Sequence, residues 1–186
     1  GETSYPTLQE AVDAVSAGTA SGTVVTLTGD VSGNGVVVKS GTDLTLDLGG
    51  HTYTVDGSTV GSAGTETNGF QLLQNSNITF KNGTIKSDKA VILIQNYSNL
   101  TLDGVSLEGG KLTQYTLSNN NGNTVIGAGT NVKAGQAAPG VAFDVCGFLS
   151  YKQVSVTVSP DAGAIVGAIE LSSGNDADLS LSINGG

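Results

Sequence analysis

Two stretches of this chain carry the same short pattern, in which amide side chains precede an apolar–Thr–apolar triplet. QNSNITF begins at Gln74, and QNYSNLTL begins at Gln95. A third triplet begins earlier, at Leu44, so that the three copies start at positions 44, 78 and 100, which are 34 and then 22 residues apart. A repeat of this length is typical of a solenoid, in which each coil buries its apolar side chains only against neighbouring coils.

The order of residues within the repeat predicts how the coils are stacked. Weaker copies begin at Thr124, Val154 and Leu179. Because like residues recur in like order, neighbouring coils are expected to run parallel, with each residue about 4.8 Å above its counterpart. The pattern therefore predicts an all-β fold, a right-handed single-stranded parallel β-helix.

Stacked coils also predict vertical columns of like side chains. The amides are expected at one corner, where they can hydrogen-bond along a column; they are Asn75, Asn77, Asn96, Asn99 and Asn119 to Asn121. A second column, of outward-facing hydroxyls, is predicted from Thr45, Thr79 and Thr101, and a third, of alternating charge, from Asp47, Lys81 and Asp103.

The N-terminal segment has a helical pattern instead. In TLQEAVDAVSAG, residues 7–18, Thr7 and Glu10 have capping-box spacing, and Gly18 supplies the stop. The apolar residues fall on one stripe, so the helix is expected to lie on the first coil. We expect one domain, with an arm and capping helix over residues 1–18 and coils over 19–186, and with loops between Val55 and Phe70 and between Val132 and Val141.

Composition excludes several classes of function. All 7 basic residues are lysines and the net charge is −9, which disfavours nucleic acid and anionic lipid. No stretch of 18 apolar residues exists, so no membrane span is predicted. The single cysteine, Cys146, allows neither an intrachain disulfide nor a multi-cysteine metal site.

The TLQEAVDAV helix, the recurring LTLD-type strands and the Asn corner together resemble the right-handed parallel β-helix superfamily that is often called pectate-lyase-like. The resemblance covers nearly the whole chain and implies a scaffold in which a helix caps the first coil. It also implies that polysaccharide lyase or glycoside hydrolase activity on acidic glycans is the alternative function to consider.

The residues themselves favour a non-catalytic module. A lyase of this scaffold needs converging carboxylates for calcium and a basic residue, but Lys81 lies between Asp47 and Asp103 and neutralises them. None of the polygalacturonase motifs is present. We therefore predict no catalytic residues, no metal site and no cofactor, with calcium as the alternative. A third possibility is an ice-binding solenoid, because the outward threonines stack, although charged residues share their face.

The remaining prediction is a bacterial extracellular or cell-surface module that binds glycans or a host surface ligand, or that serves as a structural or adhesive stalk. The candidate ligand-binding residues are Asp47, Lys81, Asp103, Tyr53 and Tyr97. We expect the chain to derive from a longer, exported precursor. Its C-terminal edge, at LSLSINGG, is expected to continue into further coils or to pair with another chain.

Overall fold

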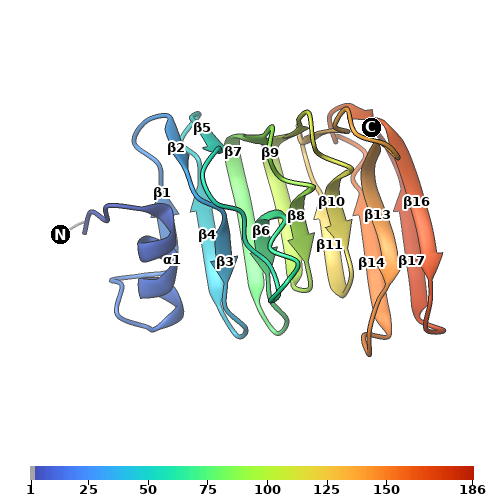
Figure 1. The fold of residues 1–186 in the computed structure, drawn as a ribbon, viewed down its shortest axis with the longest axis horizontal. Coiled ribbons are helices and arrows are strands. Elements are labelled where there is room, and N and C mark those ends of the chain that lie inside the picture. The colour runs from blue at the N-terminus through green and yellow to red at the C-terminus, as the bar shows by residue number, and fades with distance from the viewer. Residues whose placement is uncertain (1–2) are drawn as a thin grey trace.

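A computed structural model describes residues 3–186, which form one helix followed by a parallel β-solenoid (Figure 1). Every pairing between named strands is parallel. The prediction of an all-β parallel solenoid with an N-terminal helix is therefore confirmed. One sheet contains six strands, one for each coil, and a second, 11-stranded sheet bends around a corner to form the other two sides.

The coils thus have three faces, which we number in the order in which the chain crosses them. The first face contains β1 (Val24–Thr26), β4 (Asp43–Asp47), the first half of β7 (Asn77–Ser87), the first half of β9 (Asn99–Gly109), β11 (Gly122–Ile126), β14 (Gln153–Val158) and β17 (Asp178–Ile183). The second face contains β2 (Val31–Gly33), β5 (Thr52–Val55), the second halves of β7 and β9, β12 (Asn131–Lys133) and β15 (Ile165–Val166). The third face contains β3 (Val36–Val38), β6 (Asn68–Leu72), β8 (Ile92–Asn96), β10 (Tyr115–Asn119), β13 (Val141–Gly147) and β16 (Ala168–Ser173).

The register of the first face confirms the predicted stacking of the triplets. Leu44 lies beside Ile78, and Ile78 lies beside Leu100. The next residue in this file is Thr124, as the copy at that position predicts. In the last two copies the equivalent positions fall two residues after the starts seen in the sequence, at Val156 and Leu181.

The core is the apolar interior of the coils. Successive strands bury alternate side chains, so that Leu46, Phe80 and Leu102 form a file with no exposed surface. Three aromatic rings, one from each face, pack edge to face in the core, with ring centroids 5.7 Å apart for Tyr53 and Phe70 and 5.4 Å apart for Phe70 and Phe80. Full burial of a large apolar side chain contributes about 1.5–3 kcal/mol, so this core holds the coils together.

The bend between the first and second faces depends on a glycine in the long strand β7. Gly83 has φ of +159°, and a Cβ there would lie 2.4 Å from the carbonyl oxygen of His51 and 2.5 Å from the Cβ of Leu48. No side chain fits at this distance, so the coil turns the corner only with glycine at this position.

The helix α1 (Leu8–Ser16) covers the first coil, as predicted. The Thr7 side chain accepts a hydrogen bond from the Glu10 amide, which confirms the N-cap. The Gln9 side chain accepts from the backbone N–H of Val37 at 2.7 Å and donates to its carbonyl oxygen at 2.9 Å. A single amide thus takes the place of a neighbouring strand at the edge of β3, which would otherwise be open to pairing.

The two predicted loops are present. One connects β5 to β6 and contains an isolated antiparallel bridge between Val60 and Asn68. The other connects β12 to β13.

Among the described residues, no helix has the length and apolarity needed to cross a bilayer.

Candidate functional site

The outer side of the first face carries a ladder of polar side chains at the point where each strand begins. Asn77 Nδ2 donates to Asp43 Oδ1 at 2.8 Å, and Asn99 Nδ2 donates to Asn77 Oδ1 at 3.1 Å. The Asn123 backbone N–H donates to Asn99 Oδ1 at 3.1 Å, and Ser155 Oγ donates to Asn123 Oδ1 at 2.6 Å. We call these five residues the amide ladder. They connect five successive coils.

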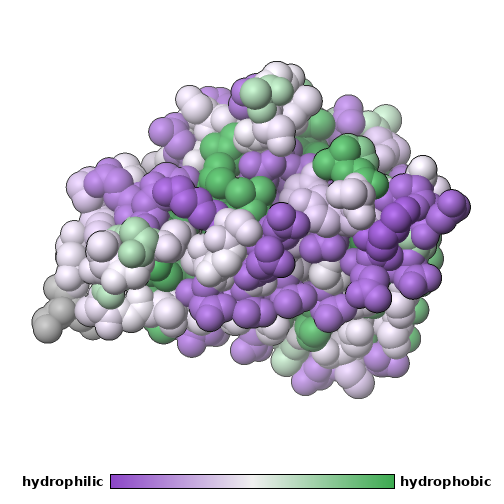
Figure 2. Space-filling model, turned by 90° about the horizontal axis from the view of Figure 1, so that it is seen from below, coloured by the Kyte–Doolittle hydropathy of each residue, from purple (hydrophilic) through white to green (hydrophobic). Residues whose placement is uncertain are grey.

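The amide ladder borders a shallow depression of about 220 Å³ that lies over β4, β7 and β9. Its lining includes Thr45, Thr79 and Thr101, which are neighbours in the strand register, so the predicted threonine column is confirmed. The depression thus combines hydroxyl and amide groups that repeat at the spacing between strands. Figure 2 shows the side of the molecule at which the third face turns into the first. Hydrophilic side chains extend there from coil to coil along the length of the solenoid.

The predicted charge column is also formed. Asp47 lies beside Lys81, which lies beside Asp103. The Lys81 ammonium is 3.3 Å from Asp47 Oδ2. The pKa of Asp47 is lowered, first because its carboxylate accepts the backbone N–H of Gly49, and further because Asn82 and Lys81 stabilise the charge. The column is therefore a partly exposed ion pair followed by an exposed carboxylate, and it is worth little to stability.

The two candidate tyrosines are buried. Tyr53 is 2% exposed, and its hydroxyl donates to the carbonyl oxygen of Asn34 at 2.7 Å. Tyr97 is 7% exposed, accepts a hydrogen bond from Gln95 and packs against Tyr151 with ring centroids 5.1 Å apart. Burial raises the pKa of each hydroxyl to about 12. Neither ring has a free face for a sugar, so we do not include them in the proposed surface.

The predicted Asn corner divides into two separate ladders. Asn77 and Asn99 are exposed in the amide ladder, whereas Asn96 and Asn119 are buried inside the corner. Asn96 Nδ2 donates to Asn119 Oδ1 at 3.2 Å and to Thr124 Oγ1 at 2.9 Å. These buried amides satisfy one another where the chain leaves the third face, so their role is structural.

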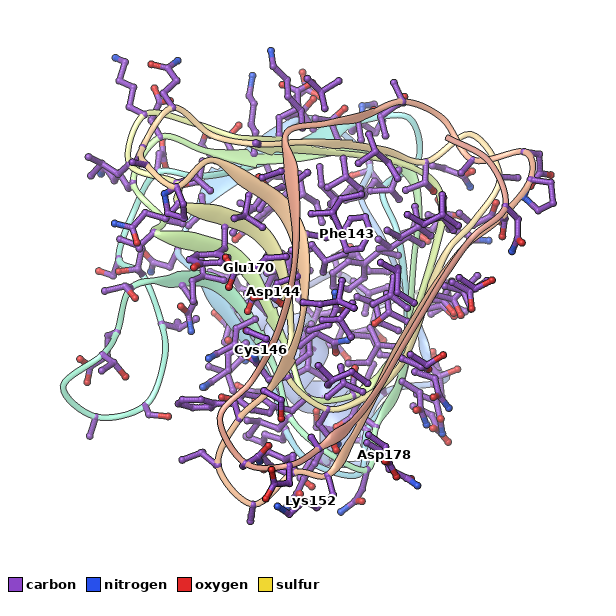
Figure 3. The ribbon with its side chains drawn as sticks, turned by 90° about the vertical axis from the view of Figure 1, so that its right-hand side faces the viewer. Phe143, Asp144, Cys146, Lys152, Glu170 and Asp178 are labelled. Carbon is purple, nitrogen blue, oxygen red and sulfur yellow. The ribbon has the colours of Figure 1, made fainter. Side chains whose placement is uncertain are left out.

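The sequence reasoning missed a buried carboxyl on the outer side of the third face. Asp144 is 3% exposed, accepts the Ser118 hydroxyl at 2.8 Å and the Asn119 backbone N–H at 2.6 Å, and lies beside Glu170 in the register. Figure 3 shows Phe143 inside the coil and Asp144, Cys146 and Glu170 on the opposite side of the ribbon. Burial raises the pKa of Asp144 to about 7, because the two hydrogen bonds only partly offset the lost hydration and Glu170 adds a like charge.

A signal for Asp144 was available, since it is the one acid within the apolar run VAFDVCG. The sequence gives only a weak indication that Asn123 and Ser155 belong to the amide ladder. The last coils do not repeat the Asn–apolar–Thr order, so these two residues can be placed in the ladder only from the strand register.

The described residues, 3–186, contain no group of three or more His, Cys, Asp or Glu side chains that could hold a metal ion. No family model, curated protein or solved structure matches this chain.

Proposed function

We propose that the chain is a non-catalytic solenoid module that binds a neutral, extended glycan along the outer side of its first face. The observation that carries the proposal is the amide ladder beside the threonine column, which forms one continuous polar surface over successive coils. A rigid scaffold of this kind also suits a spacer or adhesive stalk at a cell surface, and we place the protein outside the cell.

The hydrogen-bonding capacity of the ladder supports the proposal. Each side-chain amide has two N–H donors and two acceptor lone pairs. Asn77 and Asn99 use part of this capacity on their neighbours, and both side chains are exposed. Each rung therefore keeps donors and acceptors for a ligand, and the rungs recur every 4.7–4.9 Å along the axis. That interval is similar to the length of one sugar residue in an extended glycan.

The negative charge of the chain favours a neutral glycan over an acidic one. The chain has a net charge of −9, and Asp43, Asp47 and Asp103 lie on or beside the proposed surface. A polyanionic glycan such as pectin or alginate would be repelled, whereas a neutral one would not.

Membership of the pectate-lyase-like superfamily and an origin in a bacterial surface protein belong to the same proposal, and they are supported by the scaffold and its capping helix.

The test is an NMR titration of the chain with a neutral linear hexasaccharide such as cellohexaose, beside pectin and alginate fragments, with a neutral-glycan array to extend the search. We expect the neutral ligand to shift the side-chain amide signals of Asn77, Asn99 and Asn123 and to leave the second face unchanged. The double variant Asn77→Ala/Asn99→Ala should lose at least tenfold in affinity. The matched control, Thr54→Ala on the outer side of the second face, should bind like wild type.

Three outcomes would overturn the proposal. One is the absence of binding to any neutral glycan on the array. Another is the release of unsaturated uronides or new reducing ends from pectin or alginate, with or without calcium, which would make the chain an enzyme. The third is thermal hysteresis of freezing that is lost in Thr79→Val, which would assign the threonine column to ice.

A further inference from the structure

The two exposed asparagines of the amide ladder use only half of their hydrogen-bonding capacity within the protein. Asn77 donates one N–H to Asp43 Oδ1, and its Oδ1 accepts one N–H from Asn99. Asn99 also accepts once, from the backbone N–H of Asn123. Because a side-chain amide has two N–H donors and two lone pairs, one of each has no partner within residues 3–186.

The buried amide of Asn96 shows the contrasting pattern. Its Nδ2 donates to Asn119 Oδ1 and to Thr124 Oγ1, and its Oδ1 accepts from the backbone N–H and from the hydroxyl of Ser98. Both donors and both lone pairs are therefore used, as expected for an amide with a structural role. The exposed amides keep a donor and an acceptor that a ligand can reach.

The groups at the two ends of this run fix the direction in which the exposed amides point. The Asp43 carboxylate can only accept, so Asn77 faces it with Nδ2. The Asn123 backbone N–H can only donate, so Asn99 faces it with Oδ1. Each of the two amides thus donates toward the preceding coil and accepts from the following coil.

This direction decides which N–H of each amide is free. In a planar amide, the N–H that points opposite to the C=O is the one trans to the oxygen, as in a peptide group. Asn77 and Asn99 use that N–H in the ladder, so the free N–H is the one cis to the oxygen. It shares an edge with the free lone pair of Oδ1, and this edge lies on the side away from Cβ. Because both side chains are exposed, the edge faces solvent.

We propose that this edge binds the vicinal diol of a sugar, with one hydroxyl accepting from the free N–H and its neighbour donating to Oδ1. Asparagine recognises the adjacent acceptor and donor of adenine through a bidentate pair of the same kind. Thr79 and Thr101 line the same depression and add hydroxyl groups beside the diol. The inference rests on the proposed function, and it narrows the ligand to neutral glycans whose interior sugars keep neighbouring free hydroxyls, such as 1,4-linked hexose polymers.

Isothermal titration calorimetry with three neutral hexasaccharides tests the proposal. The interior sugars of cellohexaose carry free hydroxyls at C2 and C3. Those of laminarihexaose have C3 in the linkage, and those of chitohexaose carry an acetamide at C2, so both lack the vicinal pair. We expect cellohexaose to bind at least fivefold more tightly than either. Equal or weaker binding of cellohexaose would overturn the diol inference and leave the proposed function in place, whereas no binding to any neutral glycan would overturn both.

NMR and one substitution locate the contact. Cellohexaose should shift the Asn99 Nδ2 proton that is cis to Oδ1 more than the trans proton. Asn99→Asp keeps an acceptor for the Asn123 N–H but removes the donor of the edge, so it should lose the preference for cellohexaose over laminarihexaose. Thr54→Asp adds the same charge on the second face and should keep the preference. Far-ultraviolet circular dichroism confirms that both variants are folded. A larger shift of the trans proton, or a preference that survives in Asn99→Asp, would contradict the diol contact.

Discussion

The buried carboxyl of Asp144 is expected to make the stability of the solenoid depend strongly on pH. Its side chain is 3% exposed, and its pKa is raised from 3.8 to about 7, chiefly by burial. An acid whose pKa is higher in the folded than in the unfolded chain binds its proton more tightly when folded. The free energy of unfolding therefore falls as pH rises from about 4 to about 7, and this contribution is constant above that range.

The magnitude follows from the two pKa values. A difference between 3.8 and about 7 corresponds to about 4 kcal/mol of unfolding free energy. Asp144→Asn removes the ionisation but keeps an oxygen for the Asn119 N–H, and the Ser118 hydroxyl can rotate to accept from the new amide. We expect the variant to be more stable than wild type at pH 8, by up to about 4 kcal/mol, and the advantage to disappear toward pH 4.

Urea unfolding measured every half unit from pH 4 to 8.5, at fixed ionic strength and protein concentration, provides the assay. The control is Asp103→Asn, which removes an exposed carboxyl from the first face. Wild type and Asp103→Asn should show the same downward slope between pH 4 and 7, and Asp144→Asn should lack most of it. If Asp144→Asn keeps the full slope, the burial of this carboxyl does not control the pH dependence and the reasoning is refuted.

Three further substitutions test other parts of the structure. Gln9→Ala should lower the urea-unfolding free energy by about 1–3 kcal/mol, because the N–H and C=O of Val37 lose their partners; an unchanged midpoint would show that the helix does not cap β3. Phe80→Ala should cost about 3–5 kcal/mol in the same assay, since the ring has no exposed surface, and a loss below 1 kcal/mol would place it outside the core. Lys81→Gln should cost less than about 1 kcal/mol, and the difference should vanish in 1 M salt; a larger, salt-independent loss would contradict a surface ion pair.

The parts of the fold that depend on repetition could be predicted from the sequence. Leu44, Ile78 and Leu100 share a file because a parallel solenoid is the arrangement that places like residues over one another. The Thr7 cap and the apolar stripe of α1 are local signals, and the structure confirms both. The segments after Gly83 and Gly104 have strand patterns of their own, but the sequence does not show that β7 and β9 continue around the corner through these glycines without a break.

The candidate site was only partly predictable, for physical reasons. Composition cannot distinguish a tyrosine that covers the core from one that faces solvent, and Tyr53 and Tyr97 are of the first kind. The same limit applies to the asparagines, since Asn96 and Asn99 lie three residues apart but on opposite sides of the corner. Which amides face outward is decided by the turn between the third and first faces, and this turn has no clear sequence signal.

The central claim is that neighbouring coils run parallel and place the rungs of the amide ladder side by side. Through-hydrogen-bond NMR couplings test this claim directly, because they identify the carbonyl that each amide contacts. The structure places the Asn99 amide on the Ser76 carbonyl oxygen, at 3.0 Å, and the Leu48 amide on the Lys81 carbonyl oxygen, at 2.8 Å. We predict measurable couplings for both pairs; couplings from these amides to carbonyls in an antiparallel register would contradict the fold and the surface built on it.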